Sequence, residues 1–354
     1  MPPPRSSRPG VLVCGAGVFG RNHLRVYRAL EDEGFPLRLV GVVEPDLVRA
    51  GAAATDWGAP VFSSIEESLA ARARNELDFV AASVCTPTSL HFDVSQTLLA
   101  AGIDLLVEKP IATTVKQASR LIDLAARHER ILQIGHLERF NPAVLATGSI
   151  LNQPMFFEAH RLSIFTPRAL DVDVVLDLMV HDLDIVLSLV RSPVRSLHAV
   201  GLPILSRKVD IANVRVEFES GCVANFTASR VSTEKVRKLR FFQPHQYVSI
   251  DYARRDLLVI DVSRAAHADP TAFAAAASAG AAGFPGLHIE KPPVQPGEPL
   301  RLEIEAFLEC VRTRSAPRVS GEDGRAALAL ALDINAAIAT HAERAGLARF
   351  ANQP

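Results

Sequence analysis

A glycine-rich turn near the amino terminus, within the stretch VLVCGAGVFGRNH, constrains the fold of this 354-residue chain more than any other feature. Gly15, Gly17 and Gly20 stand in GxGxxG spacing, directly after an apolar run and at the start of an amphipathic segment. In this pattern the first glycine permits a tight turn, the second lets a pyrophosphate approach the backbone, and the third lets helix and strand pack closely. The helix amino terminus then offers N–H groups to the anion. We therefore predict a dinucleotide-binding loop made of Gly15, Ala16, Gly17, Val18, Phe19 and Gly20.

Short apolar runs alternate with amphipathic segments over the first third of the chain. The runs are 11–14, 37–43, 61–62, 79–85, 103–107 and 131–134. Strands that are apolar on both faces and alternate with helices are typical of a parallel sheet covered on both sides. The pattern predicts a doubly wound α/β Rossmann domain over residues 11–135, preceded by a disordered tail at residues 1–10.

The pattern changes after about residue 140, and we assign residues 136–354 to a second, α+β domain. Val214, Val216 and Phe218 alternate with charged residues before a Ser-Gly turn, which predicts an antiparallel hairpin with one wet face. A long helix is expected over residues 169–191, and a loop or disordered segment over 264–299. Apolar residues at helical spacing predict helices around 304–311 and 325–340, with a carboxy-terminal helix packing back on the Rossmann domain.

Composition excludes several classes of protein. The formal net charge of −1 and the absence of a basic stripe argue against a nucleic-acid binder. The four cysteines are scattered and form no CxxC pair, so we expect neither a metal site nor a disulfide framework. No run is long and apolar enough for a signal peptide or a membrane helix. A cytoplasmic enzyme without a membrane partner is the expectation.

The second apolar run ends in VGVVEPD, and its glutamate predicts the choice of cofactor. Glu44 lies 24 residues after Gly20, near the usual position for hydrogen-bonding an adenosine ribose. A carboxylate there would repel a 2′-phosphate, so NAD is favoured over NADP. Arg49, about one helical turn further on, weakens that preference.

Three polar residues could carry out proton transfer. Oxidation of a secondary alcohol needs a base, and histidine has a suitable pKa. Asp177 and His181 are four residues apart on a predicted helix and share a face, so the carboxylate could orient the imidazole. Lys109 ends a predicted parallel strand, at the edge where such sheets bind ligands. Asp184 is expected to support the histidine and Asp182 to be solvated. The alternative for His181 is a purely structural salt bridge.

Several motifs together resemble the Gfo/Idh/MocA family of oxidoreductases. They are the amino-terminal GxGxxG, CTPTSLH at 85–91, EKP at 108–110, DLMVHDLD at 177–184 and the carboxy-terminal VSGEDGRAALALALDI. The resemblance implies a Rossmann domain, a second domain with a large mostly antiparallel sheet used for oligomer contact, and NAD(P)-dependent chemistry on sugars or cyclitols. It also implies that Lys109, Asp177 and His181 face the nicotinamide, and that the cofactor is lined by Thr86, Pro87, His91, Glu108 and Lys109. For His91 a structural role at the strand end is an equal alternative.

Two further stretches, GHLERFNPA and FTPRALDVDVVLDLMVHDLD, resemble one branch of that family. The branch contains UDP-N-acetylglucosamine 3-dehydrogenases, which oxidise the sugar 3-hydroxyl to a ketone that a partner aminotransferase then aminates. Asp173 replaces the glycine common in that branch, and its carboxylate would disfavour a diphosphate if it pointed inward. The expected diphosphate or sugar contacts are Arg139, Asn141, Arg161 and Arg168, since arginine suits phosphate; surface charge is the alternative for each.

Other functions remain open at this level. A dehydrogenase of free sugars or cyclitols would need fewer arginines near its pocket, and biliverdin-type reduction would not need the Asp177/His181 pair. A non-catalytic dinucleotide-binding regulator should lack Lys109 or His181. A homodimer or homotetramer is expected. The sequence leaves open which of Lys109 and His181 accepts the proton.

Overall fold

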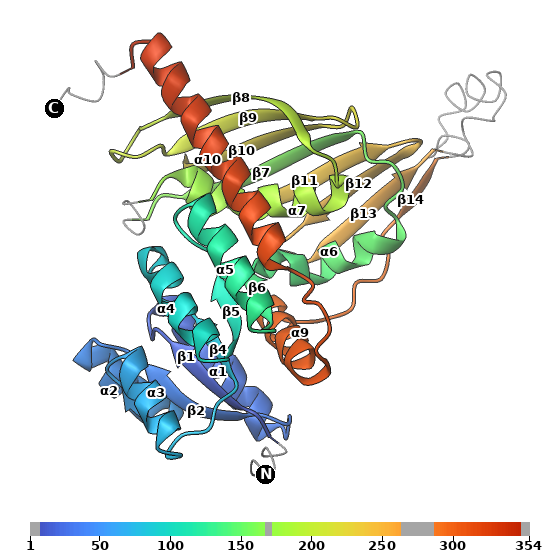
Figure 1. Cartoon of the computed structure of the whole chain (residues 1–354). Coiled ribbons are helices and arrows are strands. Elements are labelled where there is room, and N and C mark those ends of the chain that lie inside the picture. Colours follow the sequence, from blue (N-terminus) through green and yellow to red (C-terminus); the bar gives the residue numbers. More distant parts are fainter. Residues whose placement is uncertain (1–7, 167–171, 263–286, 348–354) are drawn as a thin grey trace, which may run out of the picture. The chain divides into compact units, whose positions relative to one another are not determined.

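The computed structural model describes residues 8–166, 172–262 and 287–347, and the chain divides into two compact units (Figure 1). The first unit comprises Met1–Leu137 and Glu298–Ala329, and the second comprises Glu138–Gly297 and Leu330–Pro354. The segment 298–329, which the sequence pattern assigned to the second domain, therefore belongs with the first.

The first unit is built on a six-stranded sheet in the order β3-β2-β1-β4-β5-β6, with every pair of neighbours parallel. Its strands are β1 Gly10–Cys14, β2 Arg38–Val43, β3 Val61–Phe62, β4 Ala81–Val84, β5 Asp104–Glu108 and β6 Leu132–Gly135. Its connecting helices are α1 Val18–Asp32, α2 Leu47–Trp57, α3 Ile65–Ala73, α4 Thr88–Ala100 and α5 Val115–Arg127. The predicted doubly wound fold is confirmed. Its strand order reverses between β1 and β4, where such sheets bind ligands.

One helix from the far end of the chain completes the core of this unit. Helix α9 (Pro299–Thr313) buries its apolar stripe against α1 and the sheet. The stripe consists of Leu300, Ile304, Phe307, Leu308 and Val311, all at most 9% exposed. These positions have the three- and four-residue spacing noted in the sequence, because residues at that spacing lie on one face of a helix and only that face is buried. Helix α9 and the first turns of the last helix, α10 (Gly321–Arg344), up to Ala329, both belong to the first unit, and Arg325 of α10 donates to Ser119 Oγ at 3.2 Å.

The second unit contains an eight-stranded sheet in the order β14-β13-β12-β11-β7-β10-β9-β8, in which β7 and β10 form the one parallel pair. Its strands are β7 Phe156–Ile164, β8 Val194–Leu202, β9 Ile211–Phe218, β10 Val223–Ser232, β11 Val236–Gln243, β12 Gln246–Asp251, β13 Asp256–Asp261 and β14 His288–Glu290. The predicted hairpin is β9–β10 and has the expected alternation of burial. The expected large, mostly antiparallel sheet is confirmed.

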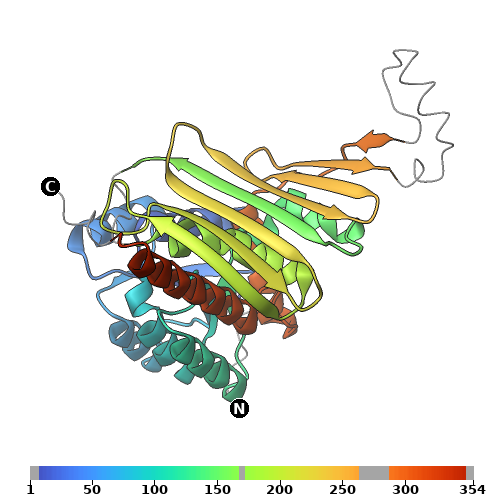
Figure 2. The same ribbon diagram turned by 90° about the horizontal axis from the view of Figure 1, so that it is seen from above.

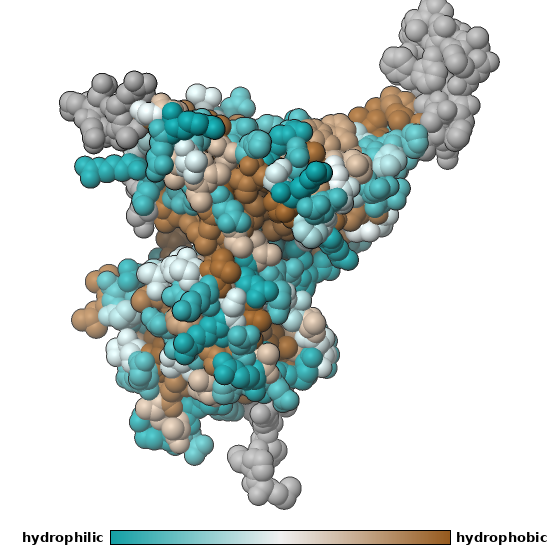
Figure 3. Space-filling model, turned by 45° about the horizontal axis from the view of Figure 1, so that its top comes forward, coloured by the Kyte–Doolittle hydropathy of each residue, from teal (hydrophilic) through white to brown (hydrophobic). Residues whose placement is uncertain are grey.

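Helices cover one face of this sheet. They include α6 Pro142–Ala146, α7 Val180–Val190 and the part of α10 (Gly321–Arg344) that follows Ala329; short helical turns are η1 Leu137–Phe140, η2 Thr147–Ser149 and η3 Val175–Met179. Figure 2 shows the opposite face without a helix from the described residues. That face carries an aromatic row in which the Phe242 ring centroid lies 5.6 Å from Phe156 and 5.2 Å from Tyr247. Figure 3 shows apolar and polar surface intermingled on the side that it displays.

Some expected elements differ in extent or lie outside the described residues. The helix expected over 169–191 is observed from η3 onward, and residues 167–171 lie outside the description. Residues 264–286 of the expected loop and 1–7 of the expected tail also lie outside it, while the described part of that loop contains strand β14 and the tail's last residue, Gly10, begins β1. The last helix is longer than expected, spanning Gly321–Arg344. Within the described part, no helix combines the length and apolar character needed to cross a bilayer.

The β8–β9 connection is organised around one buried carboxylate. Asp210 is fully buried and accepts hydrogen bonds from the backbone N–H groups of Ile204, Leu205 and Ser206 at 2.7, 2.6 and 2.8 Å. The Ser206 hydroxyl donates to the same carboxylate at 2.7 Å. Burial alone would raise the pKa of Asp210, but these hydrogen bonds outweigh it and hold the pKa below its ordinary value.

We predict that Asp210→Ala lowers the free energy of unfolding by about 3 kcal/mol, because several N–H groups lose a charged acceptor. The folded-state pKa of Asp210 is lowered, so its stabilisation is complete above the unfolded-state pKa of about 3.9 and is lost as the pH falls below it. Urea unfolding at neutral pH and at pH values below that point should therefore show the difference between wild type and variant shrinking in acid. Asp256→Asn, at an exposed pair with Lys291, is the control and should change little. A difference for Asp210→Ala that does not depend on pH would contradict the assignment.

Candidate active site

A cavity of 510 Å³ opens at the carboxyl ends of the parallel strands in the first unit. It contains five residues predicted to bind the cofactor, namely Gly15, Gly17, Glu44, Thr86 and Pro87. Sequence reasoning did not assign other lining residues, including Pro45, Ser63, Ser64, Ile65, Leu90 and Val94. Their signal was available, since each follows β2 or β3 or lies in the first turns of α4. The remaining predicted cofactor residues (Ala16, Val18, Phe19, Gly20, His91, Glu108 and Lys109) do not line this cavity.

The turn between β1 and α1 needs glycine at two positions for different reasons. Gly15 has φ of +96°, and a Cβ there would lie 2.7 Å from the Cys85 carbonyl oxygen. A Cβ on Gly20 would lie 1.8 Å from the Gly15 carbonyl oxygen. Any side chain at Gly20 would therefore push the first turn of α1 away from the turn that precedes it.

The amino terminus of α1 can bind an anion. Its N-cap residue is Gly17, no side chain caps the helix, and its first turn contains no acidic residue. The first N–H groups of a helix lack partners within the helix, so they are available to a ligand here. The buried Thr86 Oγ1 in the cavity wall also has no hydrogen-bond partner among the described residues. Free donors at the helix end and an unpaired hydroxyl fit a dinucleotide.

Glu44 supports the glycine turn in addition to facing the cavity. It is 4% exposed and accepts hydrogen bonds from Ala16 N at 2.8 Å, Asp46 N at 3.0 Å and an Arg49 guanidinium nitrogen at 3.0 Å. Burial alone would raise its pKa, but these three donors outweigh it and the pKa of Glu44 is lowered. An ionised carboxylate has about four acceptor positions, so one remains for a ribose hydroxyl.

The strand end that carries Lys109 is held from two sides. Glu108 is 8% exposed, and its Oε1 lies 2.9 Å from Nε2 of the fully buried His23. His91 lies with Nδ1 2.8 Å from the Pro110 carbonyl oxygen and Nε2 2.9 Å from the Thr86 carbonyl oxygen. Of the two roles considered for His91, the geometry favours the structural one. Burial lowers the pKa of His91, while its contacts with the two carbonyl oxygens, which can only accept from a ring N–H, oppose that shift.

Asp177 and His181 lie in the second unit, at the start of the helix that covers its sheet. Both are partly exposed, whereas Val180 and Asp182 beside His181 are buried. Asp177 is within the π-helical turn η3, which differs from the α-helix expected there. Because a π turn contains an additional residue, side chains four apart are rotated relative to an α-helix. Such turns are frequent at functional sites.

Asp173 anchors the start of that helix. One of its carboxylate oxygens accepts hydrogen bonds from Val175 N at 3.0 Å and Leu176 N at 2.9 Å, and the other accepts from Asn335 Nδ2 at 3.0 Å. The carboxylate thus satisfies N–H groups at the helix start and ties it to α10. These contacts account for the position of the Asp173 carboxylate.

Two expectations about charged residues are corrected here. Arg161, predicted to contact a diphosphate, is 3% exposed and donates to Asp182 at 2.7 and 3.0 Å and to Glu138 at 3.1 Å. Asp182, expected to be solvated, is 2% exposed and is Arg161's partner. The guanidinium also lies 5.1 Å from the Tyr252 ring centroid. A buried guanidinium whose N–H groups face internal carboxylates is structural, because withdrawing it would leave two buried negative charges.

The other expected substrate contacts also make internal interactions. Asn141 caps α6 through Ala143 N at 3.1 Å and donates to the Tyr252 carbonyl oxygen at 3.0 Å. An Arg139 nitrogen lies 3.5 Å from an Asp184 carboxylate oxygen, and Asp184 is 2% exposed. Asp184 therefore pairs with Arg139, and its expected support of His181 stays a prediction. Arg168 lies outside the described residues.

Sequence reasoning missed one arginine in this region. Arg237 lies opposite Arg161 in the β7–β11 register and alternates with the buried Leu239 and Phe241, which places it on the helix-covered face. Burial, and next the positive charge of Arg161, lower the pKa of Arg237, while the negative charge of Asp177 is among the influences that raise it. The guanidinium of Arg237 makes no hydrogen bond or ion pair within the described part of the chain, while its backbone carbonyl oxygen accepts from Tyr252 N at 3.0 Å. Alternation along β11 was the signal that could have identified it.

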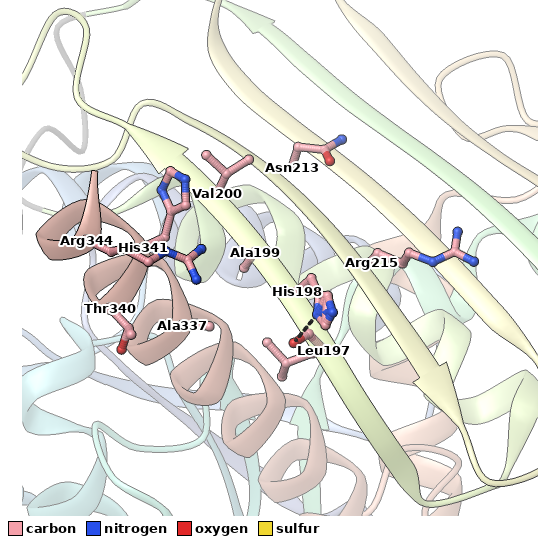
Figure 4. A pocket seen from close by; sticks show the side chains of 10 residues that line it. All are labelled: Leu197, His198, Ala199, Val200, Asn213, Arg215, Ala337, Thr340, His341 and Arg344. Atoms are coloured by element: carbon pink, nitrogen blue, oxygen red, sulfur yellow. Dashed lines mark hydrogen bonds between the residues drawn. The ribbon is translucent and has the colours of Figure 1, made fainter. Parts of the chain in front are cut away.

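A larger cavity, of 680 Å³, lies in the second unit beside β8, β9 and α10 (Figure 4). Its side chains include His198, Arg215, His341 and Arg344, and it contains none of the predicted site residues. Basic groups in the last turn of α10 complement the negative end of the helix dipole, which gives them a structural explanation. Over the described ranges, no group of three or more His, Cys, Asp or Glu residues is arranged to hold a metal ion.

Comparison with known proteins covers both units. The model of an oxidoreductase family with an NAD-binding Rossmann fold matches residues 10–136, and that of the GFO/IDH/MocA C-terminal domain matches residues 148–243. The UDP-N-acetylglucosamine 3-dehydrogenase of Acidithiobacillus ferrooxidans is 33% identical over 94% of this chain and 98% of its own length. A crystal structure of that enzyme from the same organism gives a TM-score of 0.80 at 31% identity, covering 93% of this chain and 97% of that one. The inositol 2-dehydrogenase of Leifsonia xyli is 29% identical over 52% of this chain and 54% of its own.

We predict that Arg161→Met lowers the free energy of unfolding by about 3–5 kcal/mol, because Asp182 and Glu138 lose their buried counter-charge. Urea unfolding measures the loss. Arg240→Met is the matched control: Arg240 pairs with Glu158 at 3.7 Å, both side chains are 35% exposed, and its removal should cost less than about 1 kcal/mol. An Arg161→Met protein of normal stability with a raised KM for its sugar would instead restore the diphosphate role.

We predict that Arg49→Ala reduces affinity for NADP roughly tenfold and changes affinity for NAD much less, because a guanidinium favours a 2′-phosphate. Arg49 is the one cation among the described residues that line the nucleotide cavity. Calorimetric titration with each cofactor measures the two affinities. Arg21→Ala, at an exposed pair with Asp56, controls for the loss of charge. An equal loss for both cofactors would show that Arg49 contacts the part that they share.

Proposed function

Because the chain belongs to the Gfo/Idh/MocA family of oxidoreductases, whose first domain is an NAD-binding Rossmann fold, we propose that it is an NAD-dependent dehydrogenase of a nucleotide-activated amino sugar. The proposed reaction oxidises the 3-hydroxyl of UDP-N-acetylglucosamine to a ketone. A dehydrogenase of free sugars or cyclitols is the second candidate, since inositol 2-dehydrogenase is also a relative.

One observation favours the nucleotide sugar over inositol. Similarity to UDP-N-acetylglucosamine 3-dehydrogenase extends over nearly the whole chain, whereas similarity to inositol 2-dehydrogenase covers about half of it. Substrate selectivity in two-domain dehydrogenases depends on the residues outside the Rossmann domain. Sequence similarity that extends beyond that domain is therefore the better guide to the substrate. The contacts of Asp173 support this proposal, because its carboxylate is used within the second unit.

The proposed chemistry divides between cofactor and protein. Bound NAD would supply the hydride acceptor, and the glycine turn and the α1 amino terminus would hold its pyrophosphate. We assign removal of the single hydroxyl proton to one of Lys109 and His181, namely the one that is unprotonated when the sugar binds, with Asp177 orienting the imidazole. A lysine ammonium also stabilises the negative charge that develops on the hydroxyl oxygen. Arg237 is our candidate for the diphosphate, because its guanidinium has no ion-pair partner in the described part of the chain.

The 3-keto product suggests an aminotransferase as the next enzyme, since a ketone is its natural acceptor.

We also propose a homodimer or homotetramer that uses the open face of the large sheet, where Phe156, Phe242 and Tyr247 form the aromatic row. Sedimentation of the purified protein tests the oligomer.

The test of the proposed function is NADH formation by purified protein with UDP-N-acetylglucosamine, UDP-glucose, myo-inositol and glucose. Turnover should be highest with UDP-N-acetylglucosamine. NMR of the product verifies that the 3-hydroxyl of the sugar has been oxidised to a ketone. Turnover confined to myo-inositol or glucose would replace the proposal with the second candidate.

We predict that Lys109→Ala and His181→Ala each lower kcat roughly 100- to 10,000-fold, as expected for loss of a proton-transfer group. NAD binding, measured by calorimetry, should persist because neither side chain lines the nucleotide cavity. Lys116→Ala, on an exposed face of α5, is the control for loss of a lysine. Near-normal kcat in either variant would remove that residue from the mechanism.

A further inference from the structure

Two buried histidines hold the residues on either side of Lys109. His23 comes from α1 and His91 from α4, and they are 0% and 1% exposed. On one side, His23 Nε2 lies 2.9 Å from Oε1 of Glu108. On the other, His91 Nδ1 lies 2.8 Å from the carbonyl oxygen of Pro110. Both contacts lie within the first unit.

Each histidine is itself fixed by its second ring nitrogen. His23 Nδ1 lies 3.1 Å from Ser83 Oγ, which is 2.8 Å from the Tyr27 hydroxyl. His91 Nε2 lies 2.9 Å from the Thr86 carbonyl oxygen, where β4 ends. The two rings therefore link the end of β5 to α1 and to Thr86 after β4, and Thr86 lines the nucleotide cavity.

We propose that His23 and His91, here called the histidine pair, are positioning residues that fix the backbone on both sides of Lys109 and thereby place its ammonium group for proton transfer. This inference rests on the proposed function only for the role of Lys109. Strand β5 ends at Glu108, so residues 109 and 110 lie beyond the ladder pairs that β5 makes with β4 and β6. Beyond the end of β5, the contacts of the histidine pair hold the backbone on both sides of Lys109. A catalytic group displaced by about 1 Å can lose roughly 100-fold in rate.

The two histidines use opposite nitrogens, and this makes a crossed test possible. An asparagine amide reaches about as far as Nδ1 of histidine, and a glutamine amide about as far as Nε2. His23→Gln can therefore still contact Glu108, and His23→Asn can contact only Ser83. For His91 the order reverses, because Nδ1 is the nitrogen that contacts Pro110.

The experiment measures kcat, KM and the pH dependence of kcat for the four variants. We expect His23→Asn and His91→Gln to lose kcat roughly 10- to 100-fold and to shift the pH profile, with His23→Gln and His91→Asn retaining most of kcat. Thr147→Val is the control, since it removes a buried hydrogen bond in the second unit, from Thr147 Oγ1 to the Val144 carbonyl oxygen at 2.6 Å, and leaves both histidines unchanged. Its kcat and pH profile should match wild type.

Unfolding midpoints separate positioning from folding. The proposal is overturned if the Asn and Gln variants lower kcat equally at each position. It is also overturned if kcat falls in step with the unfolding midpoint while the pH profile stays unchanged, because the histidine pair is then only structural. Should the wild type oxidise none of the sugars, the proposed function fails separately. In that case the histidine pair is tested by the rate at which an amine-acylating reagent modifies Lys109, measured by mass spectrometry as a function of pH. Rates that change in His23→Asn and His91→Gln but not in His23→Gln and His91→Asn support the proposal. Identical rates in all four variants overturn it.

Discussion

The first unit depends on the contact between the first turn of α1 and the β1–α1 turn. A Cβ on Gly20 would lie 1.8 Å from the Gly15 carbonyl oxygen, so the helix can take its position only with glycine there. That position determines where the helix amino terminus points, and thus where an anion can bind. It also places His23, one turn further along, against Glu108. One close backbone contact therefore determines both the nucleotide site and the surroundings of Lys109.

In the second unit a buried ion pair has the corresponding role. Arg161 on β7 binds Asp182 through two nitrogens and Glu138 through a third. Such pairs contribute little net stability compared with apolar side chains, but their geometry is demanding. With Asp182 directed at the sheet, the rotation of α7 about its axis is fixed. His181, the preceding residue, is left partly exposed, as its proposed role in proton transfer requires.

The sequence predicted those features that follow from periodicity and from the special conformations of glycine. The Rossmann sheet, the β9–β10 hairpin and the glycine turn were all predicted, because each leaves a local pattern. The contacts of Arg161, Asn141 and Asp182 were not, since a charged or polar residue looks the same in sequence whether it meets solvent or a buried partner. The π turn at Asp177 was also missed, because its hydrogen bonds depend on the packing of the whole helix. The roles of Lys109, Asp177 and His181 come from residue type and spacing together with the family resemblance, and they are proposals that the variants test.

The discontinuous first unit has a consequence for how the protein is made. Its Rossmann core lacks the stripe of α9, including Ile304 and Phe307, until the carboxy-terminal part of the chain is available. On the ribosome, residues 1–137 therefore emerge long before the helix that covers one side of their core, and α1 exposes apolar surface throughout synthesis of the large sheet. Domain-by-domain folding in order of synthesis is the general rule for multidomain chains. In this protein the amino-terminal unit is the first to begin folding, yet it cannot be completed until most of the second unit has been synthesised.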